Sequence, residues 1–200
     1  MKKIVLRSGR DYERLIRKIK YYKSFLFIKT EFIIEDRTNN KNVPIICEAL
    51  NIKNRKKRID YIYDQACKMI DDNTKGINIC GFKKGQCYIQ RKQKNNKCNG
   101  CCRMCLYQTS RGCSTKNLAC KLFNCSEVKK RHEVIRFEDL DFLKILSIRQ
   151  RIIVKSDYFS KREDVLRDLY SYSIIVSSIV LVIRIIRNFI LAKKRKCSFD

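Results

Sequence analysis

The sequence has 200 residues and a mass of 23.9 kDa, and its 46 Lys and Arg against 20 Asp and Glu give a formal net charge of +26. Because 44% of the residues are hydrophobic, the chain can bury a core, which excludes a wholly disordered basic tail. Six glycines and one proline exclude collagen-like and Pro/Gly low-complexity proteins.

The composition divides the chain into three segments. Residues 1–79 are basic and predict an N-terminal helical segment, whereas residues 80–125 hold nine of the twelve cysteines, ten basic residues and no acidic residue. Residues 126–200 predict a C-terminal helical segment. The expected fold class is mainly α, with helical segments that flank a small, irregular, Cys-rich metal-binding module.

Two amphipathic helices and one short helix are expected in the first segment. Ser8 and Asp11 have the spacing of a capping box with Asp in place of Glu, and an apolar face with helical spacing follows them. Residues 25–34 could form a short strand instead of continuing that helix. Pro44 suits the first turn of a further short helix. A second amphipathic helix is expected over 54–72. Its basic start, Lys53 to Arg58, is interpreted as a solvated helix start, with nucleic-acid binding as the alternative.

In the last segment, apolar positions predict one helix over 137–154. A capping box formed by Ser160 and Glu163 predicts the start of another helix, which includes Val165, Leu166 and Leu169.

Residues 170–192 form the most apolar run of the chain. The run includes Arg184 and Arg187 and is followed by the basic residues 193–196. A membrane-spanning helix needs about 20 mainly apolar residues, and two arginines inside it are costly. One span would also place the basic tail and the thiol-rich segment on opposite sides of a membrane. A buried or partner-binding helix is therefore favoured, and a membrane anchor or a strand are the alternatives.

The cysteines of the middle segment have the spacing of metal ligands. Two CxxC units stand back to back, and a CxxC turn lets two sulfurs converge on one tetrahedral ion. With five further cysteines, the segment can supply two four-cysteine zinc sites and one spare thiol. The predicted ligands are Cys80, Cys87, Cys98, Cys101, Cys102, Cys105, Cys113, Cys120 and Cys125.

Structural zinc, as two Zn²⁺ ions, is the favoured interpretation because the segment has few large aliphatic residues and needs cross-links to fold. The main alternative is an iron–sulfur centre, which four cysteines can hold. Catalysis is not expected, because the chain has one His and lacks the phosphate-binding GxxxxGK[ST], dinucleotide-binding GxGxxG and nucleophile GxSxG motifs.

Three stretches carry a resemblance to a known group of proteins: Asn78 to Phe82, Gly100 to Cys105, and Gly112 to Cys125. Together with the helices expected on either side, these stretches resemble uncharacterised cysteine-cluster proteins of low-GC Gram-positive bacteria, over roughly residues 55–170. The resemblance implies a bacterial origin and a cluster of metal-binding cysteines, but no activity.

The expected function is that of a zinc-stabilised, strongly basic binding module in the cytoplasm, because the start of the chain has no apolar stretch long enough for a secretory signal. Nucleic acid or another polyanion is the favoured partner, since basic residues attract phosphates and aromatic residues among them can stack on bases. The alternatives are a thiol-based redox or metal-handling protein, a protein partner bound through 170–192, and a membrane-associated protein anchored by 170–192. The expected nucleic-acid surface is Lys83, Lys84, Arg91, Lys92, Lys94 and Arg103, with Phe82, Tyr88, Tyr107 and Phe123.

Overall fold

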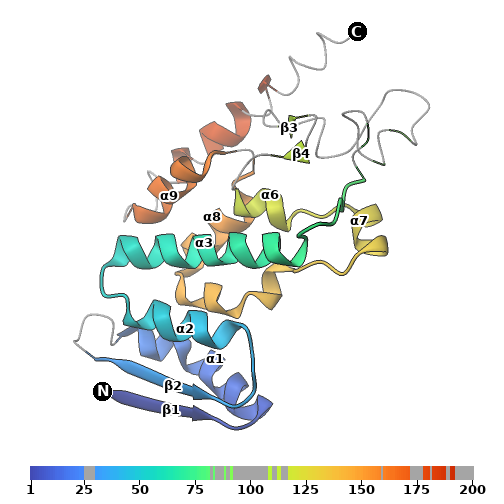
Figure 1. The fold of residues 1–200 in the computed structure, drawn as a ribbon. Helices are drawn as coiled ribbons and strands as arrows, with labels where there is room; N and C mark the ends of the chain where they lie inside the picture. Colours follow the sequence, from blue (N-terminus) through green and yellow to red (C-terminus); the bar gives the residue numbers. More distant parts are fainter. Residues whose placement is uncertain are drawn as a thin grey trace.

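The fold is mainly α-helical, with a small two-stranded parallel sheet at one end (Figure 1). The computed structural model describes residues 1–24, 30–81, 83, 88, 91, 108–109, 112–113, 117–158, 160–171, 178–180, 182–187 and 190–191. The mainly α class predicted from the sequence is confirmed.

The sheet pairs β1 (Lys2–Leu6) with β2 (Phe32–Asp36) in parallel, and Ile4 lies opposite Ile34. Parallel neighbours need a long crossover, which here contains α1 (Gly9–Ser24). β1 was not predicted, because five residues are too few to show a clear alternation of apolar and polar positions. The second strand falls at the end of the stretch 25–34 that was considered for a strand, and 25–29 lie outside the described residues.

The capping box predicted at the start of α1 is confirmed. The Ser8 backbone N–H donates to Asp11 Oδ2 at 3.2 Å, and the Asp11 N–H donates to Ser8 Oγ at 3.4 Å. Leu15, Ile19 and Tyr22 are buried on one face of α1, as their spacing indicated. The opposite face of the helix is therefore left for charged residues.

Two further helices follow the sheet. α2 (Asn42–Asn51) carries Pro44 in its first turn, as predicted. α3 (Arg55–Asn73) matches the predicted helix over 54–72 within one residue at each end, and the Asn54 side chain caps it by accepting from the Lys57 N–H. Its buried face includes Ile62 and Tyr63. α3 itself crosses the middle of the molecule (Figure 1).

Residues 108–131 return the chain to this helical body. β3 (Gln108–Thr109) and β4 (Gly112–Cys113) form a short antiparallel pair. α6 (Leu118–Leu122) then packs against α3, and α7 (Ser126–Arg131) follows it.

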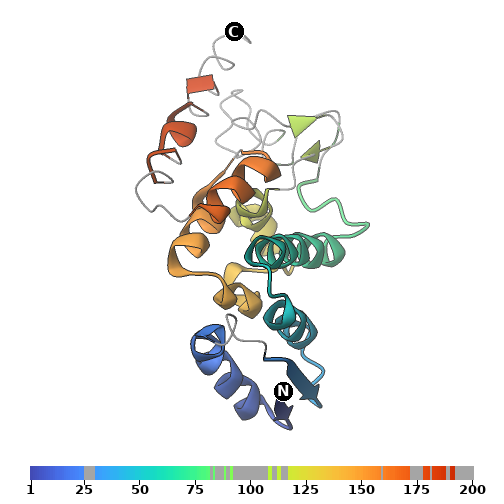
Figure 2. The same ribbon diagram turned by 90° about the vertical axis from the view of Figure 1, so that its left-hand side faces the viewer.

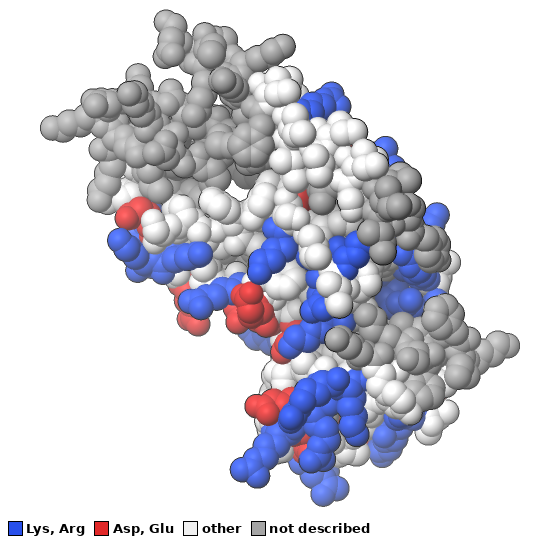
Figure 3. Space-filling view, turned by 180° about the vertical axis from the view of Figure 1, so that it is seen from behind, with Lys and Arg blue, Asp and Glu red and all other residues white. Residues whose placement is uncertain are grey.

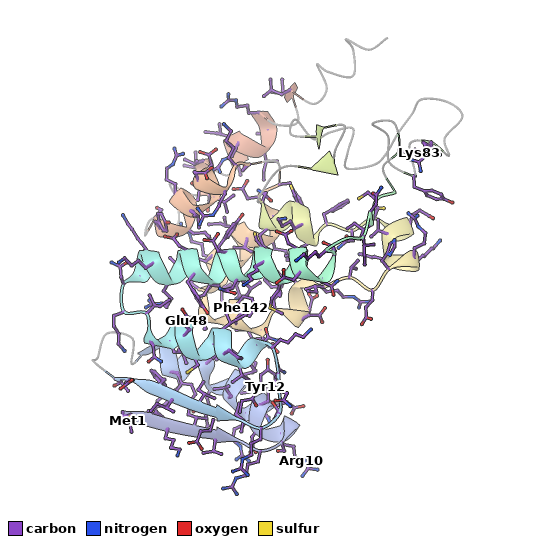
Figure 4. All side chains as sticks on the ribbon, in the orientation of Figure 1. Met1, Arg10, Tyr12, Glu48, Lys83 and Phe142 are labelled. Atoms are coloured by element: carbon purple, nitrogen blue, oxygen red, sulfur yellow. The ribbon has the colours of Figure 1, made fainter. Side chains whose placement is uncertain are left out.

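The prediction of a single helix over 137–154 is wrong. The structure has two 3₁₀ turns, η2 (Phe137–Asp139) and η3 (Asp141–Ile145), followed by α8 (Ile148–Ser156). The break has a local cause, because Ser147 and Gln150 form a reciprocal capping box that starts a new helix. Phe142 is fully buried and lies near the centre of the molecule (Figure 4).

A helix follows Ser160 as predicted, but its cap differs. α9 (Arg162–Tyr170) buries Val165, Leu166 and Leu169, and its N-cap residue is Lys161, whose side chain makes no capping bond. The Ser160 hydroxyl donates instead to the Asp157 carboxylate. Ser160 is therefore used by the core rather than by the helix end.

One hydrophobic core extends from Leu6 to Leu169 and draws residues from both flanks of the cysteine-rich segment. The Tyr12 hydroxyl, for example, donates to Asp141 Oδ2 at 2.7 Å, and Asn42 Nδ2 donates to the Asp139 carbonyl at 3.1 Å. The cysteine-rich segment is thus inserted into a helical body that is completed by the residues after it.

Of the apolar helix predicted over 170–192, Ser171 is not helical, and residues 172–177, 181, 188–189 and 192 lie outside the described residues. α9 ends at Tyr170, and the residues 178–180, 182–187 and 190–191 are again helical, running along one edge of the molecule beside α9 (Figure 2). In the part of the chain that the structure describes, no helix combines the length and the apolar character that crossing a membrane requires.

Candidate functional site

The structure describes only some of the nine predicted metal ligands. Cys80 follows α3, Cys120 lies in α6, and Cys125 precedes α7, while Cys113 is described in its backbone as part of β4. The other five predicted ligands, Cys87, Cys98, Cys101, Cys102 and Cys105, lie outside the described residues. Among the described side chains, no group of three or more His, Cys, Asp and Glu residues could hold a metal ion.

The segment that carries Cys120 is fixed firmly to the helical body. Asn117 is fully buried and caps α6, because its Oδ1 accepts from the Cys120 N–H at 2.9 Å. Its Nδ2 donates to the carbonyls of Asp157 and Ser160 at 2.7 and 3.0 Å. The Leu118 N–H donates to the Tyr63 hydroxyl at 2.9 Å, which joins α6 to α3. The backbone around Cys120 is therefore attached to the helical body by several hydrogen bonds.

The start of the cysteine-rich segment contacts α7, which follows the end of that segment. The Tyr88 N–H donates to the Cys80 carbonyl at 3.0 Å, and the Arg131 guanidinium lies 4.2 Å from the centre of the Tyr88 ring. Gly81 has a φ of +57°, and a Cβ at this position would lie 3.4 Å from the Tyr88 Cβ, which is an ordinary van der Waals contact. A glycine suits this position because the left-handed backbone region disfavours other residues.

Part of the nucleic-acid surface predicted around the cysteines makes contacts within the fold. Arg91 donates to the Gly81 carbonyl at 2.6 Å, and the Phe123 ring packs edge-on against Tyr158. Lys83 is exposed and lies at the outer edge of the molecule (Figure 4). The remaining predicted residues of that surface, Phe82, Lys84, Lys92, Lys94, Arg103 and Tyr107, lie outside the described residues.

Cys67, which lies in α3 and was not among the predicted ligands, is held as a neutral thiol. Its side chain is buried, and burial raises the pKa of the thiol to about 12. Since metals bind the thiolate form, this high pKa agrees with a structural role for Cys67.

An exposed group of basic side chains lies on α1 among the described residues, and sequence reasoning missed it. Arg10, Arg14 and Arg17 follow helical spacing on the face opposite the buried one, and all three are exposed. Figure 3 shows basic side chains gathered at this end of the molecule, and Figure 4 places Arg10 at its outer edge. The signal was present in the sequence as arginines at i, i+4 and i+7 opposite Leu15, Ile19 and Tyr22.

These arginines have few partners among the described residues. Arg17 lies 3.8 Å from Glu13, whose carboxylate is also exposed, and no ion pair to Arg10 or Arg14 occurs in the described part of the chain. Asp11, the other acidic residue of α1, accepts hydrogen bonds from Arg7 and Ser8 at the start of the helix, and these lower the pKa of its carboxyl. The α1 basic face, defined as Arg10, Arg14, Arg17 and Lys18, therefore presents its charge to solvent.

The basic start of α3 is used differently. Arg55 donates to the carbonyls of Tyr170 and Leu169 at 2.6 and 3.2 Å, and it thereby caps the end of α9. Arg58 donates to the carbonyl of Ile52, just after α2, at 2.7 Å. Lys53 donates to the Thr30 carbonyl, and Lys56 lies 5.5 Å from the centre of the Tyr170 ring. Most of this run is committed to the fold.

Another cation, Arg184, lies against two buried carboxylates. Its Nη1 is 3.1 Å from Asp157 Oδ2, and its Nη2 pairs with Asp168 Oδ2. The side chains of Arg184, Asp157 and Asp168 are 14%, 1% and 7% exposed, respectively. Burial raises the pKa of the Asp157 carboxyl to about 6, while the Ser160 hydroxyl and Arg184 oppose that rise. Removing Arg184 would leave two carboxylates without their cation.

Comparisons of this chain with protein-family models, with curated proteins and with solved structures find no match. The function of this protein is therefore inferred from its own residues. The strongest features are the exposed α1 basic face and the spacing of the cysteines.

Proposed function

We propose that this protein binds nucleic acid through the α1 basic face and that its cysteine-rich segment holds structural zinc. The observation that carries the proposal is the exposure of Arg10, Arg14 and Arg17 on one helix face, with one weak ion pair among them in the described part of the chain. Exposed guanidinium groups bind phosphate oxygens in bidentate fashion and without a large desolvation cost.

The dimensions of the α1 basic face suit a phosphate backbone. Arg10 and Arg17 are seven residues apart on a helix, which is about 10 Å along its axis. Duplex DNA carries about six phosphate charges over such a length. Tyr21 lies one turn further along the same face and is 56% exposed, and Lys2 Nζ lies 5.2 Å from the centre of its ring, so an aromatic ring and a further cation are both available to a single-stranded ligand.

Zinc is the metal that we propose for the cysteine-rich segment. The back-to-back CxxC units and the ten basic residues without an acidic one favour thiolate ligands, because nearby cations lower thiol pKa values. The contacts of Asn117 and Arg131 supply a fixed base on which an ion would cross-link the rest of the segment. A thiolate cluster also needs a reducing compartment, so we propose the cytoplasm as its location.

Oligonucleotide binding tests the proposal. Fluorescence anisotropy with labelled single- and double-stranded DNA and RNA, measured from 50 to 300 mM salt, should show binding that weakens as salt rises. The variant Arg10→Ala/Arg14→Ala/Arg17→Ala should lower the slope of log K against log salt by about three. The matched control Lys57→Ala/Lys68→Ala/Lys75→Ala also removes three exposed charges and should bind almost as well as the wild type. Equal losses in both variants would contradict a role for α1.

Metal analysis tests the second part of the proposal. Protein purified without added metal should be colourless and should contain about two zinc ions per chain, as two four-cysteine sites require. A coloured sample with stoichiometric iron and sulfide would replace zinc with an iron–sulfur centre. The proposed relation to cysteine-cluster proteins of Gram-positive bacteria would be supported by zinc, but it does not depend on nucleic-acid binding.

A further inference from the structure

The helical residues between 178 and 191 carry a row of large aliphatic side chains that point into solvent. The members of this row, called here the C-terminal apolar face, are each more than half exposed: Ile179, Val182, Ile183, Ile186 and Ile190. They recur at the spacing of one helix face. Exposing such a continuous row to water is costly, and it marks an interaction surface.

The outward direction of the C-terminal apolar face is fixed by Arg184. This residue is one position after Ile183, about 100° around the helix axis, and its guanidinium pairs with the buried carboxylates of Asp157 and Asp168. If the helix rotated to bury its isoleucines, it would have to break both ion pairs and leave the two carboxylates uncompensated. The ion pairs therefore hold the helix with its apolar face away from the core.

The charges around this helix indicate what covers the face. Residues 169–199 contain six basic residues and no acidic one. Arg184 is neutralised by its two aspartates, while Arg187 is exposed and Lys193, Lys194, Arg195 and Lys196 follow in the sequence. An aliphatic helix face with Arg187 beside it and four basic residues following in the sequence has the composition of a helix that lies in the surface of an anionic bilayer. Each basic residue near such a surface contributes about 1 kcal/mol of attraction.

We propose that the C-terminal helix binds the surface of an anionic lipid bilayer and lies in the plane of that surface. The C-terminal apolar face enters the boundary between headgroups and acyl chains, and Arg187 contacts lipid phosphates. A second copy of the chain fits less well, because pairing two of these helices brings their basic residues together with no carboxylate between 169 and 199 to compensate.

An in-plane helix also removes the difficulty that a spanning helix raises. It leaves the cysteine-rich segment and the basic tail on the same side of the bilayer, so no part of the chain crosses it. Moreover, α1 and the C-terminal helix lie at opposite ends of the molecule (Figures 1 and 2). Binding of lipid at one end therefore leaves the α1 basic face accessible.

Vesicle co-sedimentation of the full-length protein tests this proposal. The protein should sediment with vesicles of 70% phosphatidylcholine and 30% phosphatidylserine, and much less with pure phosphatidylcholine. Ile183→Ser/Ile186→Ser/Ile190→Ser should weaken binding by about tenfold or more, because it removes three buried aliphatic groups from the lipid contact. The control Ile77→Ser/Ile148→Ser/Ile152→Ser also removes three exposed isoleucines and should sediment like the wild type.

Three outcomes would overturn the proposal. Undiminished vesicle binding by the first isoleucine variant would show that attraction by charge alone is responsible, and absence of wild-type binding would exclude a lipid surface. If analytical ultracentrifugation shows a wild-type dimer that the same variant dissociates, the face is a contact between copies. The Arg10→Ala/Arg14→Ala/Arg17→Ala variant should still bind vesicles, which separates this test from that of nucleic-acid binding.

Discussion

Two basic stretches of this chain have similar compositions and opposite uses. The start of α3 directs Arg55 and Arg58 to backbone carbonyls at the ends of other helices, whereas α1 directs Arg10, Arg14 and Arg17 to solvent. Carbonyls at a helix end lack partners within their own helix and carry partial negative charge, so they attract cations. A run of basic residues is therefore a binding surface only where no such carbonyl is within reach.

The same contrast recurs within one helix, where Arg184 is paired with buried carboxylates and Arg187 is exposed. Paired and exposed cations should respond differently to removal: the former should alter folding, and the latter should alter binding. Three sites test this comparison, and the expected loss of stability decreases from Arg184 to Arg55 to the arginines of α1.

Arg184→Gln should have the largest effect on stability. At pH 8 it leaves the Asp157 and Asp168 carboxylates buried without their cation, and we expect a loss of about 3 kcal/mol in the free energy of unfolding. The loss should shrink at pH 5, because a protonated Asp157 no longer needs a cation. Urea denaturation at both pH values measures this difference. Arg187→Gln, which removes an exposed cation three residues later, is the control and should change stability little at either pH.

The wild-type protein gives a direct check of the same site. Burial holds the pKa of Asp157 at about 6, above its ordinary value of 3.8, so the folded protein binds this proton more tightly than the unfolded chain does. The stability that Asp157 contributes is therefore present below about pH 4 and is lost as the pH rises through 6. Carboxyl ¹³C NMR should show the titration near 6 in the wild type, and an ordinary value near 4 would contradict the burial.

Arg55→Ala should have an intermediate effect. It removes two charged hydrogen bonds and leaves the carbonyls of Leu169 and Tyr170 with fewer donors, which we expect to cost about 2 kcal/mol. Lys57→Ala changes an exposed side chain two residues away and should alter stability by less than about 0.5 kcal/mol. Thermal or urea unfolding of the two variants measures the difference, and similar losses would show that the capping bonds contribute little.

The α1 variants should have the smallest effect on folding. Arg10→Ala, Arg14→Ala and Arg17→Ala, made one at a time, should each change the unfolding free energy by less than about 0.5 kcal/mol, because the lost groups are exposed. Unfolding of each variant in urea is compared with that of the wild type. A loss of more than about 1 kcal/mol from one of them would show that its guanidinium supports the fold, and the contrast with α3 would fail.

The elements that were predicted correctly have signals in nearby residues of the sequence. The capping box at Ser8 and the buried stripe of α3 depend on residues within a few turns of one another, so periodicity and capping chemistry suffice to find them. The break before α8 is also local, but the Ser147–Gln150 capping box was overlooked because apolar residues on both sides of it suggested one helix.

Other features that were missed depend on distant partners, whereas the α1 basic face was visible in the helical spacing of its arginines. Whether Arg55 is free or bound is decided by Tyr170, which is 115 residues away, and the direction of the C-terminal apolar face is decided by Asp157 and Asp168. The sequence alone does not show which of these side chains are paired in the fold. The positions of the predicted metal ligands are a different case, since five of the nine lie outside the described residues and their grouping stays a prediction.

The hydrogen bond between Tyr12 and Asp141 has a consequence for synthesis of the chain. It spans 129 residues, and the apolar side chains of α1 and α2 likewise pack against η3, so the N-terminal β1–α1–β2 unit lacks part of its core until η3 has been made. At ordinary ribosomal rates, the roughly 100 residues after β2 take about 5 to 20 s. During this interval a nascent chain exposes the apolar side chains of α1 and α2 that later pack against η3.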